Sequence, residues 1–201
     1  MSRLLRTASL ALASVLFVGC AAAGVPVADA SKLSKAEEPT PAAAEVQTAK
    51  PISREQVAAA QGKWCEALVA IGAAADPAAT AKEVLSSAYN YAAAPVLFKP
   101  TLTSGKQTFR FDQEGALSYF VGGNPAYPDD HGFARKGWKT CRPEVREVYS
   151  HGDMVLAMGN VYMSDGKGSD VMVDKTFGYV RSGDSLKIVL HHSSLPYSPK
   201  P

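Results

Sequence analysis

The sequence predicts an α+β protein in which two or three N-terminal helices cover one face of a curled antiparallel sheet, an arrangement that we call a cone. Apolar residues recur at helical spacing over residues 53–91, and they alternate with polar residues over residues 145–194. Short polar turns separate the alternating segments. Helices followed by consecutive strands are typical of α+β domains. A composition of 46% hydrophobic and 20% charged residues fits one globular domain within the 201 residues.

The N-terminal segment has the pattern of an export signal. Arg3 and Arg6 precede an apolar run over residues 8–18, which is too short for a stable membrane span. We therefore expect residues 1–19 to be a signal peptide and the protein to be periplasmic. Their removal lowers Lys plus Arg from 21 to 19 against 19 Asp plus Glu, so the net charge falls from +2 to 0. A neutral mature chain is no general binder of nucleic acids or other polyanions.

Two cleavage positions compete in this segment. Phe17-Val18-Gly19-Cys20 is similar to a bacterial lipobox, although Phe17 stands in for the usual leucine, which is displaced by one position. This similarity makes Cys20 a lipidation site and gives the protein a lipid anchor in the membrane. The alternative is ordinary cleavage after Ala28-Asp29-Ala30, which fits the small-x-small rule but lies far from the apolar run. Both positions place the domain outside the cytoplasm.

Residues 20–51 are expected to form a flexible tether, and the folded domain covers residues 52–201. The tether is rich in Ala and Pro and has no large aromatic residue, so it buries too little apolar surface to offset its ordering entropy. Ser53 and Gln56 then form a capping-box pattern, which predicts the start of a helix. The helical spacing is carried by Val57, Gln61, Trp64, Leu68 and Ile71.

Further elements follow from local patterns. A second helix is expected over residues 78–91 because it must end before Pro95, and Asp112 caps a third over residues 113–120. The Gly-, Pro- and Asp-rich residues 122–137 predict a long loop. The expected strands cover residues 96–98, 108–111, 145–149, 154–163, 171–181 and 185–194.

Cys65 and Cys141 remain in the exported domain, and an oxidising compartment allows them one internal disulfide. The alternative is two separate buried thiols, since Cys65 lies beside the apolar face of the first helix. Neither cysteine belongs to a CxxC or Cys/His spacing that would indicate zinc.

The last strand draws attention because polar residues continue its apolar row. Alternation places His192 and Ser194 on the same face as Leu186, Ile188 and Leu190, which we expect to face the helices. Buried polar groups at the end of such a row must be paired or used. The alternative is that both lie beyond the rim of the core and close the strand in solvent.

The histidines do not predict a metal site. His191 and His192 are adjacent in a strand and therefore point to opposite faces. His131 and His151 fall in loops without ligand spacing. We expect no metal bound by protein ligands.

Several motifs spread over residues 96–197 resemble the iota-class carbonic anhydrases. The combination is more specific than any one motif. The motifs are Phe98-Lys99-Pro100-Thr101, Ser118-Tyr119-Phe120, Asp130-His131-Gly132-Phe133, Thr176-Phe177-Gly178-Tyr179 and the closing His191-His192-Ser193-Ser194-Leu195-Pro196.

This resemblance implies the cystatin-like cone fold of nuclear transport factor two and of the calcium/calmodulin-dependent kinase two association domain. It also implies a homodimer formed through the sheet, and carbon dioxide or bicarbonate as substrate. Metal-free members are described in the family, although others have been assigned manganese or zinc. By motif match, the catalytic residues are Thr101, Tyr119, His192 and Ser194, and the hydroxyls of Thr101, Tyr119 and Ser194 bind the substrate.

The leading hypothesis is therefore reversible hydration of carbon dioxide without a protein-bound metal, with His192 moving protons to solvent. An alternative from another class is a non-catalytic module for small-ligand binding or assembly, because one fold serves many functions. A third reading is another cone-fold enzyme with a carboxylate base such as Asp174.

Overall fold

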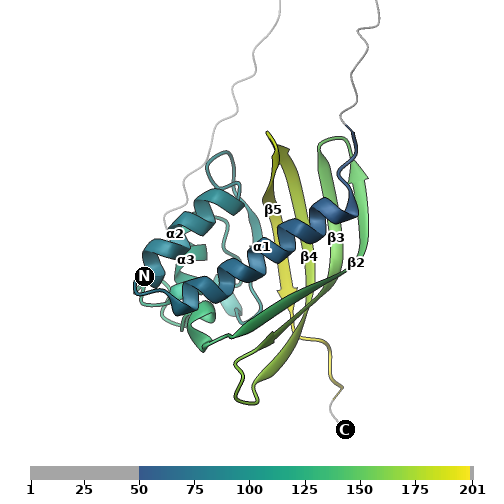
Figure 1. Ribbon diagram of the computed structural model, residues 1–201. Coiled ribbons are helices and arrows are strands. Elements are labelled where there is room, and N and C mark those ends of the chain that lie inside the picture. The colour runs from purple at the N-terminus through teal and green to yellow at the C-terminus, as the bar shows by residue number, and fades with distance from the viewer. Residues whose placement is uncertain (1–49, 200–201) are drawn as a thin grey trace, which may run out of the picture. The chain divides into compact units, whose positions relative to one another are not determined.

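The computed structural model describes residues 50–199, which form three helices packed on a five-stranded sheet (Figure 1). The expected signal peptide, most of the expected tether and Cys20 lie outside these residues. No helix within residues 50–199 is long and apolar enough to cross a membrane. The elements are α1 (Arg54–Ala73), α2 (Pro77–Ala88), β1 (Leu97–Lys99), the 3₁₀ helix η1 (Gly105–Gln107), α3 (Gln113–Val121), the 3₁₀ helix η2 (Phe133–Lys136), β2 (Thr140–His151), β3 (Met154–Ser164), β4 (Asp170–Ser182) and β5 (Ser185–Ser194).

The helices start where the sequence predicts because side chains satisfy their first free N–H groups. Ser53 and Gln56 form the expected capping box, in which each side chain accepts from the other residue's backbone N–H. Asp112 caps α3 by accepting from the N–H of Gly115 at 2.7 Å. Helix α2 ends at Ala88, three residues before the expected end.

The sheet has the strand order β1-β5-β4-β3-β2, and it curls around α1, which crosses its covered face (Figure 1). Strands β2 to β5 form an antiparallel meander, whereas β1 pairs with β5 in parallel. Helices α2 and α3 gather at the β5 end of the sheet (Figure 1). The expected α+β cone is confirmed.

A disulfide joins α1 to β2. Cys65 and Cys141 are bonded with their Cα atoms 5.1 Å apart and 76 residues apart in sequence. The structure therefore contains the disulfide, which was one of the two alternatives that the sequence allowed, and not two separate thiols. The bridge follows Trp64 directly, so it ties that residue's part of α1 to the sheet.

Two strand predictions need correction. Residues 108–111 form no strand, because their hydrogen bonds to residues 96–98 are limited to Arg110 N–H with Phe98 and Val96 N–H with Phe111. The Arg110 side chain turns inward to pair with the buried Asp130 at 2.9 Å, while Phe109 and Phe111 are exposed. Strand β2 begins at Thr140, five residues before the expected start.

Strand β5 departs from simple alternation at Val189. Tyr179 on β4 pairs with Ile188, but the preceding Gly178 pairs with Leu190, so Val189 is an extra residue in a β-bulge. An extra residue exchanges the faces of every residue beyond it. Ile188 faces the helices, and after the bulge His191 and Ser193 face them.

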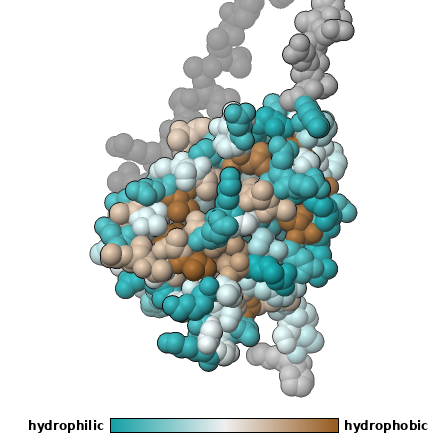
Figure 2. All heavy atoms as spheres, in the orientation of Figure 1, coloured by the Kyte–Doolittle hydropathy of each residue, from teal (hydrophilic) through white to brown (hydrophobic). Residues whose placement is uncertain are grey.

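Seen from the side that carries α1, the surface mixes hydrophilic and hydrophobic residues without one dominant apolar area (Figure 2). The opposite, uncovered face of the sheet exposes several large apolar side chains. They are Leu97, Tyr149, Met154, Leu156 and Met158, with Met158 62% exposed and Tyr149 68% exposed.

Candidate functional site

Polar side chains from five elements converge on a narrow internal space between the sheet and the helices. Strands β4 and β5 contribute one wall, α1 and α3 contribute others, and the turn after β1 closes the space. The space is too narrow for a water-sized sphere, so a ligand enters only when side chains move. Its lining consists of Trp64, Phe98, Pro100, Thr101, Tyr119, Phe120, Phe133, Lys175, His191 and Ser193.

Three hydroxyl groups lie in this lining. Thr101 Oγ1 and Ser193 Oγ are hydrogen-bonded at 2.6 Å, which fixes the turn after β1 to the end of β5. The Tyr119 hydroxyl comes from α3, is buried and has no hydrogen-bond partner with good geometry within residues 50–199, although the Thr101 side chain and the backbones of Leu102 and Thr101 lie close enough to lower its pKa. Burial dominates and raises the pKa of Tyr119 far above its ordinary value. A buried hydroxyl without a partner is a donor ready for a ligand.

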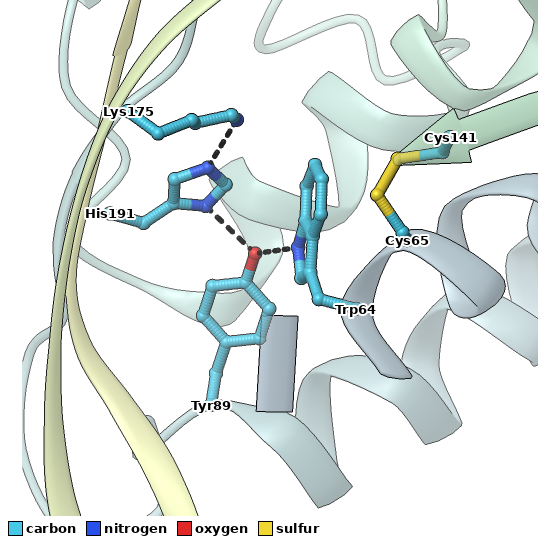
Figure 3. The surroundings of a disulfide bond; sticks show 6 residues. All are labelled: Trp64, Cys65, Tyr89, Cys141, Lys175 and His191. Carbon is cyan, nitrogen blue, oxygen red and sulfur yellow. Dashed lines mark hydrogen bonds between the residues drawn. A yellow bond between two sulfur atoms is a disulfide. The ribbon is translucent and has the colours of Figure 1, made fainter. Parts of the chain in front are cut away.

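A chain of hydrogen bonds links Trp64, Tyr89, His191 and Lys175 (Figure 3). The indole N–H of Trp64 donates to the Tyr89 hydroxyl at 2.9 Å, and that oxygen lies 2.9 Å from His191 Nδ1. His191 Nε2 lies 2.7 Å from Lys175 Nζ. The imidazole is also stacked between Phe98 and Phe177, with ring centroids 4.5 and 4.6 Å away.

The site is positively polarised. Lys175 is buried. Lys99 lies at the rim and donates a hydrogen bond to the Ser193 carbonyl at 2.9 Å. Neither lysine forms an ion pair with a carboxylate anywhere in residues 50–199. Burial, reinforced by the charge of Lys99, lowers the pKa of Lys175 to about 7. Burial, followed by the Lys175 and His192 charges, holds the pKa of His191 well below its ordinary value.

Hydroxyl donors, together with lysine side chains that have no carboxylate partner within residues 50–199, can hold a small anion in a small apolar-walled space. The family model described as metal-independent carbonic anhydrase matches residues 55–195. The chain belongs to the metal-independent carbonic anhydrase family.

Two relatives of this family resemble the chain over most of its length. The metal-independent carbonic anhydrase of Nostoc sp. (strain PCC 7120) is 42% identical over 153 residues, which cover 73% of this chain and 75% of the relative. The crystal structure of a cyanobacterial iota-carbonic anhydrase complexed with bicarbonate superposes with a TM-score of 0.72 at 41% identity, covering 74% of this chain and 95% of that chain.

More distant chains share less. One described as a calcium/calmodulin-dependent protein kinase II association domain, from Xanthomonas campestris, is 20% identical with a TM-score of 0.49. It covers 75% of this chain and 98% of its own length.

Of the four residues that the sequence assigns to the carbonic anhydrase site, the structure brings two together. Thr101 and Tyr119 both line the internal space. His192 is exposed and Ser194 only half-buried, and their cross-strand partners on β4, Thr176 and Asp174, lie on the uncovered face. The expectation that His192 and Ser194 face the interior is therefore wrong.

The bulge at Val189 explains this error. Strict alternation from Ile188 leads to His192 and Ser194, whereas one extra residue shifts the inward row to His191 and Ser193. The shift by one residue does not change which residue types face inward, because the motif His-His-Ser-Ser has each residue type twice in succession. The inward positions thus still supply one imidazole and one hydroxyl.

Sequence reasoning missed Lys175 altogether. A usable signal existed, because Lys175 alternates with Val173, Phe177 and Tyr179, all of which are buried in β4. A lysine within such a row is either at a rim or at a site. The expected strand over residues 171–181 therefore contained the evidence for a third polar residue facing the helices.

The other candidates lie away from the internal space. Asp174 is exposed on the uncovered face and accepts a hydrogen bond from Asn160 at 2.9 Å, so it does not serve as a buried carboxylate base. His131 and His151 are exposed. Within residues 50–199, no three His, Cys, Asp or Glu side chains are grouped so that they could hold a metal ion.

A separate surface groove of about 410 Å³ lies between α1, α2 and the β4–β5 hairpin. Trp64 borders both this groove and the internal space. The groove is lined by small, apolar and polar residues, whereas Thr101 and Tyr119, which the motifs single out, line the internal space. We therefore assign the chemistry to the smaller site.

Proposed function

We propose that the chain catalyses the reversible hydration of carbon dioxide to bicarbonate at the internal site, without a metal held by protein ligands. The observation that carries this proposal is the Thr101 and Ser193 hydroxyl pair beside the unpartnered Tyr119 hydroxyl. Membership of the metal-independent carbonic anhydrase family and the likeness to a bicarbonate complex support the same reaction.

The walls suit the two ligands differently. Phe98, Phe120 and Phe133 present apolar surface, which favours uncharged carbon dioxide over water. As water adds to carbon, negative charge develops on the oxygens of the forming bicarbonate. Preorganised hydroxyl donors stabilise such charge most effectively in a site that excludes water.

Each hydroxyl has a distinct part in this scheme. Tyr119 donates its O–H to a bicarbonate oxygen, because no acceptor in the described part of the chain, residues 50–199, holds that hydrogen. Thr101 and Ser193 share one hydrogen bond, so one of the two hydroxyls remains free to donate to the ligand. The ammonium of Lys99 on the rim adds positive potential for the anion.

Stopped-flow hydration assays on chelator-treated protein test the proposal. We expect the untreated and chelator-treated proteins to have equal rates, and Thr101→Val to reduce the rate at least tenfold. Binding of labelled bicarbonate without any hydration would favour the non-catalytic binding module instead. A rate that vanishes with chelation and returns with zinc or manganese would contradict the metal-free reaction.

We also propose that the chain is a homodimer that associates through the uncovered face of the sheet. Cross-strand register aligns Tyr149, Leu156, Gly178, Leu190 and Leu97 in one row across all five strands. A row of this kind, exposed on a sheet covered on one side only, is typical of an association surface.

Finally, we propose that the protein is exported, with cleavage before Cys20 and lipidation at that residue. The support is the basic start followed by an apolar run, together with a disulfide that suits an oxidising compartment. Mass spectrometry of cell-derived protein should show loss of at least residues 1–19, with a diacylated Cys20. An intact Met1 would overturn export, and a mature end after Ala30 would overturn the lipid anchor alone.

A further inference from the structure

Lys175 is a buried basic side chain of the site, and no carboxylate of residues 50–199 pairs with it. It is 5% exposed, and its only hydrogen-bond partner within residues 50–199 is His191 Nε2. The ammonium position lies 4.4 Å from the Trp64 ring centroid and 5.6 Å from that of Phe177. Burial of an unpaired charge is costly, so a group in this position tends toward its neutral form.

The partners along the hydrogen-bond chain of Figure 3 favour one direction for each proton. The buried Tyr89 hydroxyl has two partners, the Trp64 indole and His191 Nδ1. Indole N–H is a donor only, so the Tyr89 oxygen accepts from it. The Tyr89 hydrogen then has one acceptor available, which is Nδ1.

This assignment leaves the proton of neutral His191 on Nε2, pointing at Lys175 Nζ 2.7 Å away. An ammonium has no lone pair and cannot accept this proton, whereas a neutral amine can. The reverse arrangement, with an ammonium donating to Nε2, would leave the buried Tyr89 hydrogen without an acceptor. Such a loss costs about 1 to 3 kcal/mol.

We propose that Lys175 acts in its neutral form as the general base of the hydration reaction, an inference that rests on the proposed function. Lys175 and Ser193 are cross-strand partners on the inward face, and both line the internal space with Thr101. A turn of the Lys175 side chain would bring its lone pair from His191 into the site.

The step balances without any further reactant. Water oxygen forms a bond to the carbon of carbon dioxide, one C=O electron pair moves onto oxygen, and one water proton moves to Nζ. The products are bicarbonate and the Lys175 ammonium, which releases the proton to solvent in a later step. The new ammonium and the Nε2–H of His191 are both donors, so their contact is unfavourable, and a turn about the inner bonds of the Lys175 side chain brings the ammonium toward the bicarbonate anion.

The surroundings of Lys175 favour a base at neutral pH. The titratable groups that line the internal space with it are His191 on β5 and Tyr119 on α3, and the charge of Lys99 on β1 also acts on it. Helix α1 contributes Trp64, which does not titrate and whose ring face favours the ammonium. None of these neighbours is a carboxylate, and burial lowers the pKa of Lys175 to about 7.

The first test measures this titration directly in the whole protein. Isotope-labelled lysine side chains are followed by NMR between about pH 5 and pH 10 in buffer freed of carbon dioxide, and the Lys175 signal is assigned by its loss in Lys175→Met. We expect one lysine to titrate near neutrality. Titration of Lys175 near the ordinary lysine value would overturn the proposal whatever the activity.

Tyr89→Phe tests whether the proton of neutral His191 lies on Nε2. Without the Tyr89 hydroxyl, His191 can carry its proton on Nδ1 and accept from an ammonium at Nε2. We expect the pKa of Lys175 to rise in this variant, and the pH at which hydration reaches half its maximum to rise with it. An unchanged pKa would contradict the assigned direction of the chain.

Hydration rates of variants test whether Lys175 acts as the base, separately from whether the site hydrates carbon dioxide at all. We expect Lys175→Met to lower the hydration rate at pH 8 by roughly a hundredfold or more, the usual contribution of a general base. The exposed Lys82→Met, on α2, is the matched control and should keep the full rate. If the parent protein hydrates carbon dioxide and Lys175→Met does so at the same rate with the same pH profile, the inference fails while the proposed function stands. If the parent is inactive, the proposed function fails, and the NMR titration still decides the state of Lys175.

Discussion

Thr101 Oγ1 and Ser193 Oγ lie 2.6 Å apart, although 92 residues separate them in sequence. The contact forms because β1 joins the sheet in parallel beside β5, so that the chain leaving β1 turns over the end of the last strand. A substrate site at this junction depends on β1 and β5 together. The same junction holds Lys99, whose ammonium donates to the Ser193 carbonyl.

Ser193→Ala should reduce hydration strongly, whereas Ser194→Ala should not. The inward Ser193 hydroxyl pairs with Thr101, and Ser194 is half-buried on the uncovered face. Steady-state hydration rates of the two variants, together with His191→Ala and His192→Ala, compare the two faces of one strand. Greater losses in the outward pair than in the inward pair would contradict the register around Val189.

Tyr119→Phe should lower the hydration rate while leaving the free energy of unfolding nearly unchanged. Among residues 50–199 the hydroxyl has no hydrogen-bond partner with good geometry, and the ring keeps its stack on Phe133, with centroids 5.4 Å apart. Loss of one oriented donor to a developing oxyanion costs about a hundredfold to a thousandfold in rate. Urea denaturation measures the free energy of unfolding, and stopped-flow assays on the same preparation measure the hydration rate. A large stability loss with unchanged activity would assign the hydroxyl to structure.

The free energy of unfolding should rise with pH between about pH 7 and pH 10, and Lys175→Met should remove most of that rise. The folded pKa of Lys175 is near 7 and the unfolded pKa is near the ordinary value of about 10.4. In this window the unfolded state binds the additional proton, so raising the pH favours the folded state. Below about pH 7 both states are protonated and the destabilisation is fully present. Urea titrations at several pH values measure the difference between the two proteins, and parallel curves would contradict a depressed pKa.

Reduction of the Cys65–Cys141 disulfide should destabilise the domain. The bridge closes a loop of 76 residues, and the chain-entropy account gives about 4 kcal/mol for such a loop. Denaturation of the Cys65→Ser, Cys141→Ser double variant measures the loss. Because the bridge follows Trp64 directly, we also expect the NMR-measured pKa of Lys175 to shift in this variant. Equal free energies of unfolding for the bridged and unbridged proteins would contradict a stabilising role of the disulfide.

A charge on the uncovered face should prevent dimer formation. Met158 is 62% exposed in the middle of that face, and Met158→Glu would place a carboxylate against the matching surface of a second copy. Light scattering at micromolar concentration should give a dimer for the parent and a monomer for the variant. A parent protein that is monomeric under these conditions would refute the proposed interface.

Most of the fold follows from the sequence because its signals are local. The Ser53 and Asp112 caps fix the starts of α1 and α3, and the polar turns separate the strands of the meander. Residues 108–111 were predicted wrongly because their alternation looks like a strand, whereas the Arg110 side chain is drawn inward by Asp130. That attraction is a tertiary effect which no window of four residues contains.

The site was half predicted, and the missing half has one structural cause. Thr101 and Tyr119 were found from motifs, but His192 and Ser194 were chosen by assuming unbroken alternation in β5. The bulge at Val189 depends on how β5 pairs with β4, so the strand's own sequence does not reveal it. Lys175 was missed because its place in the apolar row of β4 was overlooked, and its contacts with Trp64 and His191 appear only in the folded protein.

The central claim is that hydroxyl groups of the internal site, and no metal, hydrate carbon dioxide. The most direct measurement is the exchange of heavy oxygen between carbon dioxide and water at chemical equilibrium, followed by mass spectrometry in chelator-treated protein. We expect the parent protein and the exposed-face variant Ser194→Ala to catalyse this exchange equally, and the Thr101→Val, Ser193→Ala double variant to approach the uncatalysed rate. Full exchange by the double variant, or none by the chelator-treated parent, would contradict the account.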